Sequence, residues 1–154
     1  MSTAFISGKS SVLSIAAASA TGTPTFTPIN QIKTTQYSGR KMDTEDITNM
    51  SSAGVTREYA PTLNDAGQLA ISGVWDPSDP GQLMLSAAFD AQTLLSVKHQ
   101  LPLIQDAATV QTTGPLLTYV GYVTESTFDI QFDKSSTFNA TIKITGVITI
   151  APGN

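Results

Sequence analysis

The chain has 154 residues, a length that fits one domain with its own hydrophobic core. It contains no cysteine, which excludes disulfides, thiolate metal sites and thiol catalysis. Only 13% of the residues are charged and the net charge is −4, which argues against a basic nucleic-acid-binding face. The sequence has no apolar run of about 18 residues, so no transmembrane helix is predicted.

The start of the chain permits two interpretations. Residues 1–10 are small and polar and show no hydrophobic period, which indicates a flexible N-terminal arm. Strands are predicted over 11–18 and 26–37, with a turn at 21–24 between them. Alternatively, Lys9 and the small apolar residues 12–20 loosely resemble a secretion signal with a small-residue cleavage site. In that case the chain would be a secreted or fimbrial surface subunit.

Residues 39–67 carry a large share of all the charges and show no long apolar period. We expect a long irregular loop with short extended pieces at 42–48 and 55–60. Compact domains seldom carry irregular loops of about 15 or more residues without a functional reason. This segment is therefore the best candidate for a working surface of the protein, and its charged residues include Arg40, Lys41, Asp43, Glu45, Asp46, Arg57 and Glu58.

The middle of the chain changes from strand to helix and back. Residues 68–75 alternate between apolar and polar, which predicts a strand. Asp79 as N-cap, Pro80 at the first helical position and Gln82 three residues after the cap then predict a helix over 80–91. Alternation returns over 95–101, where another strand is expected.

The last third has the clearest pattern. Every even position from 138 to 150 is apolar or small, which predicts a strand with one buried face along its whole length. Residues 117–132 alternate as well, and 133–136 provide a turn, so a long antiparallel hairpin is expected. Many strands and one helix predict a mainly β domain over 1–154, either a β-sandwich or a half-barrel with a flanking helix.

Residues with catalytic potential do not form a recognisable active site. His99 lies at an alternating strand position, which favours a half-buried structural role, and no G-x-S-x-G motif provides a nucleophile. Asp76 and Asp79 fit turn and N-cap roles, while the acidic residues of 43–46 stand beside basic ones and fit a charged surface. We therefore predict no enzyme activity, no cofactor and no metal.

Three segments resemble the major tail tube proteins of long-tailed, non-contractile phages. They are an acidic stretch ending in Asp-Ile-Thr, an Arg-Glu-aromatic stretch and an alternating strand, at 39–49, 57–61 and 67–76. A helix opened by Asp-Pro at 76–82, a glycine-aromatic strand at 121–123 and the segment 142–146 follow in the order seen in that family. The resemblance covers roughly residues 23–150.

The resemblance implies a virion protein, assembled in the host bacterial cytoplasm as hexameric rings that stack into a hollow tube. It also implies that 39–67 is an inter-subunit or inter-ring loop whose seven charged residues make the contact, and we expect this loop and residues 1–10 to be mobile before assembly. Its implied partners are further copies of itself, the tape-measure protein and double-stranded DNA in the bore, and the tail terminator and tail-tip proteins. No membrane partner is implied. A negative wall would let DNA slide, and Asp129 and Asp133 are the candidates to face the bore. An inner-tube protein of a contractile injection system would fit the same pattern.

Overall fold

The computed structural model describes residues 9–18, 22–52, 54, 56–103 and 113–153, so residues 1–8 of the predicted N-terminal arm lie outside the described residues. In chain order the elements are β1 (Val12–Ala17), β2 (Thr27–Pro28), β3 (Ile32–Ser38), β4 (Lys41–Asp46), β5 (Tyr59–Asp65), β6 (Gln68–Val74), α1 (Pro80–Ala91), β7 (Leu94–Gln100), β8 (Leu116–Asp129) and β9 (Thr137–Ala151). No helix in these ranges is both long enough and apolar enough to cross a membrane.

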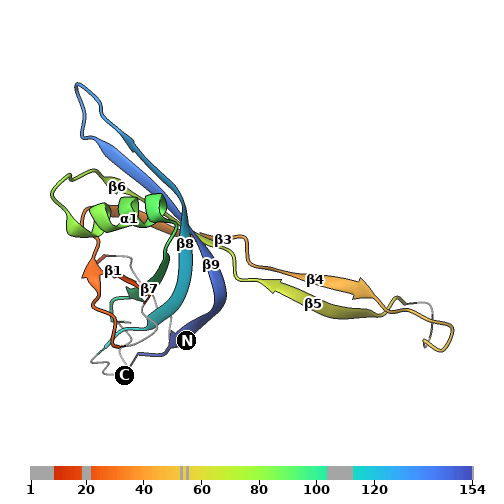
Figure 1. The fold of residues 1–154 in the computed structure, drawn as a ribbon. Helices are drawn as coiled ribbons and strands as arrows, with labels where there is room; N and C mark the ends of the chain where they lie inside the picture. The colour runs from red at the N-terminus through yellow and green to blue at the C-terminus, as the bar shows by residue number, and fades with distance from the viewer. Residues whose placement is uncertain (1–8, 19–21, 53, 55, 104–112, 154) are drawn as a thin grey trace, which may run out of the picture.

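One curled sheet forms the body of the protein. Its seven strands are ordered β2-β1-β7-β8-β9-β6-β3, and every neighbouring pair is antiparallel. α1 lies across one face, while β4 and β5 form a separate ribbon that leaves the body (Figure 1). The expectation of a mainly β fold with one flanking helix is confirmed, and the architecture is the half-barrel.

The hydrophobic core lies between α1 and the face of the sheet that α1 covers. Leu69 and Val123 flank Ile142 in the register of the central strands, and Leu85 and Ala88 of the helix belong to the same cluster. Ile142 has no exposed surface at all. Alternate residues of these strands enter the core because successive side chains of a strand point to opposite faces.

The start of α1 is tied to the sheet by hydrogen bonds. Asp79 accepts a bond from the Gln82 backbone N–H at 3.1 Å, as an N-cap does, and also from the side-chain amide of Asn30 at 2.8 Å. The Gln82 side chain donates to the Val74 carbonyl at 3.0 Å. The helix predicted over 80–91 is confirmed, and its cap fixes the helix to the loop before β3.

Two predicted strands differ from the structure. The single strand expected over 26–37 is divided into β2 and β3, with the left-handed Gln31 (φ 62°) between them. The strand expected to reach residue 132 ends at Asp129. A left-handed residue breaks the ladder because it turns the backbone away from the extended conformation.

β9 is continuous, but its burial is not. Apolar positions alternate into the core only as far as Ile144. Gly146 has a φ of +79°, and the register with β8 shifts at this point. Of the even positions beyond it, Ile148 is only partly buried against the core and Ile150 is 60% exposed, so the expectation of a buried face along the whole of 138–150 is wrong for its end.

The segment that loosely resembles a secretion signal is an internal strand of the sheet. β1 pairs along its whole length with β7, and Leu13, Ile15 and Ala16 are buried. The strand predicted over 11–18 is confirmed, and it contributes to the core.

Candidate assembly surfaces

The charged segment 39–67 is a β-hairpin, which we call the arm. β4 and β5 pair from Lys41 with Asp65 to Asp46 with Tyr59. Every residue of β4 is exposed, and the arm extends well away from the sheet (Figure 1). The expected irregular loop is therefore wrong, and the second strand lies at 59–65 rather than 55–60. Neither face of the arm is buried in its own subunit, so the sequence carries no period-two apolar pattern that would identify it.

Two glycines form the root of the arm. Gly39 and Gly67 have φ values of +77° and +88°. Gly39 follows Ser38 and Gly67 precedes Gln68, and Ser38 and Gln68 are the last paired residues of β3 and β6. A Cβ on Gly67 would lie 2.2 Å from the Ser38 carbonyl oxygen, so this position accepts only glycine. The arm is thus an insertion into the connection between two paired strands.

An ion pair connects the arm root to the central strand β9. Lys143 Nζ donates to both carboxylate oxygens of Asp65, at 2.7 and 2.8 Å. The Gly67 N–H donates to the same carboxylate at 2.8 Å. These hydrogen bonds, that from Lys143 first, lower the pKa of Asp65.

The seven charged contact candidates all lie on the arm, and most of them bond to arm neighbours. Lys41 pairs with Asp43 at 3.6 Å. Arg57 pairs with Asp46 at 3.7 Å, and the Ser52 hydroxyl donates to Glu58 at 2.7 Å. Arg40 and Glu45 have no ion pair among the described residues. The structure brings all seven onto one ribbon, and their contact role stays a prediction.

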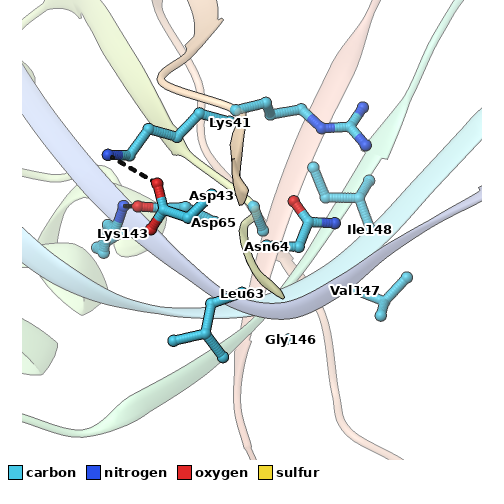
Figure 2. A pocket seen from close by; sticks show the side chains of 11 residues that line it. Lys41, Asp43, Leu63, Asn64, Asp65, Lys143, Gly146, Val147 and Ile148 are labelled. Carbon is cyan, nitrogen blue, oxygen red and sulfur yellow. Dashed lines mark hydrogen bonds and ion pairs between the residues drawn. The ribbon is translucent and has the colours of Figure 1, made fainter. Parts of the chain in front are cut away.

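A pocket of about 640 Å³ opens where the arm leaves the sheet, and we call it the arm-root pocket. Figure 2 shows the Lys41–Asp43 pair above the Asp65–Lys143 pair, with apolar side chains on the other side. The apolar lining includes the exposed Leu63 and Val147. The pocket therefore combines a charged rim with exposed apolar side chains.

No described helix or strand covers the face of the sheet opposite α1, which we call the uncovered face (Figure 1). On β9 it carries Thr141 and Lys143, which alternate with the buried residues. Glu125 and Asp129 of β8 pair with Thr141 and Thr137, so both acidic residues belong to this uncovered face. Asp133, the second residue predicted to face a bore, lies in the turn after β8.

The far end of the β8–β9 hairpin carries three exposed apolar side chains, which we call the knob: Phe128, Ile130 and Phe132. Phe128 stacks on Trp75, with ring centroids 5.2 Å apart. Phe132 is fully exposed. The alternating pattern of 117–132 identified a strand but did not show that these apolar residues lie beyond the core.

His99 is buried more completely than predicted, with only 3% of its surface exposed. Its Nδ1 lies 2.9 Å from the Tyr37 hydroxyl, which lies 3.0 Å from the Tyr119 hydroxyl. Burial lowers the pKa of His99 and raises that of Tyr119, so both are neutral at neutral pH. His99 Nε2 has no hydrogen-bond partner among the described residues, and within those residues no group of three or more His, Cys, Asp or Glu side chains is placed to hold a metal.

Replacing the central hydroxyl of this network, Tyr37→Phe, is expected to lower the free energy of unfolding by about 1–3 kcal/mol, because it leaves two buried polar groups without partners. Urea denaturation measures the change. Tyr122→Phe is the matched control: Tyr122 is 46% exposed, and its loss should stay within about 0.5 kcal/mol. Equal effects of the two substitutions would contradict a structural role for the network.

No protein-family model matches the sequence, and no curated protein matches it significantly. Several solved structures share its fold. The tail tube of SPP1 superposes with a TM-score of 0.65 at 11% identity, over 97% of this chain and 80% of that chain. A chain from the tail of an empty gene transfer agent particle, refined with C6 symmetry, gives 0.62 at 16% identity over 94% and 98%. A chain from the six-fold symmetrised baseplate of the anti-feeding prophage gives 0.68 at 11% identity over 99% and 98%. The chain has the fold of tail tube proteins.

Proposed function

We propose that this chain is the major tail tube protein of a long-tailed phage, a structural protein without enzyme activity. Its subunits would form hexameric rings that stack into the conduit for DNA, assembled in the host cytoplasm as part of the virion. The observation that carries the proposal is the combination of an open, curled sheet with a projecting arm. Each of these features leaves surface uncovered in a single subunit, and a ring of subunits would cover both.

The open sheet favours continuation into neighbouring subunits. At one edge β2 pairs with only two residues of β1, and at the other edge β3 pairs only with β6, so both edges present backbone groups that no other described strand pairs. Closing several such sheets into one barrel removes every edge. The SPP1 tail tube and the C6-symmetric gene transfer agent tail contain chains of this fold, which supports the same arrangement for this one.

The arm favours contact with another subunit. An isolated two-stranded hairpin is marginally stable in water, yet this one exposes several large apolar residues: Met42, Ile47, Met50, Tyr59 and Leu63. A neighbouring subunit would cover them and pair with the charges around them. We therefore assign the inter-subunit contact to the arm, including the seven charged residues predicted from the sequence.

The uncovered face of the sheet is the surface that would line the bore. It carries Glu125 and Asp129, while its cation Lys143 is paired with Asp65. Another cation of this face, Lys98, lies over the Phe26 ring. With Asp65 counted beside its partner Lys143, these side chains carry three negative and two positive charges, so the wall would be polar and slightly negative. Such a wall would bind phosphate weakly, so double-stranded DNA could pass without sticking and the tape-measure protein could be enclosed. The tail terminator and tail-tip proteins would close the two ends.

Reversing one of these charges tests the bore assignment. Tubes of Asp129→Lys are expected to retain short duplex DNA that nuclease cannot reach, because six added cations per ring would face the bore. The matched control is Asp90→Lys on the exposed surface of α1. Protected DNA is measured after sedimentation of nuclease-treated tubes. Equal protection by the two variants would contradict the bore assignment.

The inner tube of a contractile injection system is the second candidate. The anti-feeding prophage baseplate contains a chain of the same fold, with a TM-score of 0.68. Such a tube would bind a sheath protein on its outer, α1-bearing side, so the presence or absence of a sheath around isolated particles separates the two functions. No observation specifically favours a secreted or fimbrial subunit.

A further inference from the structure

The knob is an apolar surface that the described residues of its own subunit leave largely exposed. Phe128 is held in place by its stacking on Trp75, while Ile130 and Phe132 project at the end of the hairpin. Single exposed apolar residues are common, but three at the tip of one hairpin make this tip a candidate contact site. Acidic residues dominate its flanks, with Asp129 and Asp133 against one lysine, Lys134.

The arm-root pocket has complementary chemistry. Its apolar wall includes Leu63, 79% exposed, and Val147, 83% exposed. A Cβ on Gly146 would meet nothing within 4 Å, so the pocket is open at that point. The rim holds three cations and two carboxylates, and one of the cations, Arg40, has no ion pair among the described residues. The pocket is thus slightly positive and the knob slightly negative.

The two surfaces cannot meet within one subunit. Both lie on the β8–β9 hairpin, the knob at its turn and the pocket beside residues 146–148. Ten residues of β9 separate Thr137 from Val147, which is roughly 33 Å along an extended strand. Two different patches at separate places on one chain fit a head-to-tail contact, which repeats without closing and so propagates along an axis.

We propose that the knob of one subunit inserts into the arm-root pocket of a second copy of this chain in the next ring, with Phe132 between Leu63 and Val147 and Asp133 facing Arg40. This inference rests on the proposed tube function and specifies one contact that would hold the rings together. Removal of the aromatic rings from water would stabilise the contact, and the opposite charges would set its orientation.

The absence of cysteine makes disulfide trapping a clean test. The double variant Phe132→Cys/Val147→Cys is assembled at high concentration with a crowding polymer, oxidised, and analysed by non-reducing gel electrophoresis. Disulfides need Cα atoms within about 7 Å, so only subunits in the proposed contact can be joined. A ladder of covalent multimers that disappears on reduction is expected, whereas each single variant should remain a monomer on the gel, because in a head-to-tail contact neither residue meets its own copy.

A second pair of cysteines tests whether the arm, instead of the knob, occupies the arm-root pocket of the next subunit. Met50→Cys/Val147→Cys places one thiol at the tip of the arm, which also exposes apolar side chains. A ladder from this pair and none from the first would overturn the knob contact and assign the pocket to the arm. Tubes of the unmodified protein seen by electron microscopy, with no ladder from Phe132→Cys/Val147→Cys, would overturn the inference but leave the tube function intact. No tubes or rings from the unmodified protein would overturn both.

Discussion

A variant that lacks residues 40–66 is expected to fold as a stable monomer and to form no rings or tubes. The deletion joins Gly39 directly to Gly67, and both already have the positive φ values that a two-residue type I′ hairpin requires. Ser38 and Gln68 on either side are already paired partners. The buried core cluster contains no residue of 40–66, and of the deleted residues only the partly buried Ala66 packs against it, so the body should keep most of its stability while the inter-subunit contact is lost.

Two measurements on the deletion variant separate folding from assembly. Circular dichroism and urea denaturation should show a cooperative β-sheet protein, and electron microscopy of the concentrated protein should show no assemblies. A weaker change in the same element, Arg57→Glu with Arg40→Glu, should slow assembly without altering the body. Normal tubes from the deletion variant would show that the arm is not an assembly element.

Ile142→Ala is expected to lower the free energy of unfolding by about 2–5 kcal/mol, because it removes buried methyl groups and leaves a cavity between well-packed neighbours. Ile142 is fully buried, with Leu69 and Val123 beside it on adjacent strands. Ile150→Ala on the same strand is the matched control. Ile150 is 60% exposed, so its substitution should stay within about 0.5 kcal/mol.

Urea denaturation of the unassembled protein measures both isoleucine variants. Comparable losses at the two positions would mean that the last part of β9 is buried as the alternating sequence suggested. The expected difference instead reflects the turn at Gly146, which carries the end of the strand out of the core. The comparison applies to the unassembled protein, because in tubes a neighbouring subunit would cover exposed positions and Ile150→Ala would then also weaken a contact between subunits.

Local rules predicted most elements of the body. The helix was found because Asp79 and Pro80 are a start signal that acts within a few residues, and Gln82 completes it. β9 was found because period two is unmistakable when one face is buried. The same rule failed after Ile144, since an apolar residue at an alternating position has the same sequence signature whether it faces the core or a neighbouring subunit.

The arm could not be predicted as a hairpin for a related reason. Apolar and polar residues alternate only where a strand has one buried and one solvent-exposed face, and both faces of the arm are exposed in a single subunit. Its strand pairing is visible only in the backbone register. The pairing of Asp65 with Lys143 was also hidden, because the two residues are 78 positions apart and nothing local connects them.

Cryo-electron microscopy of the assembled protein tests the tube proposal most directly. We expect hexameric rings, stacked along one axis, in which the face with Glu125 and Asp129 lines the bore, α1 lies outside and each arm rests on a neighbouring subunit. A closed two-fold dimer as the largest assembly, or a tube with α1 facing the bore, would contradict the proposal.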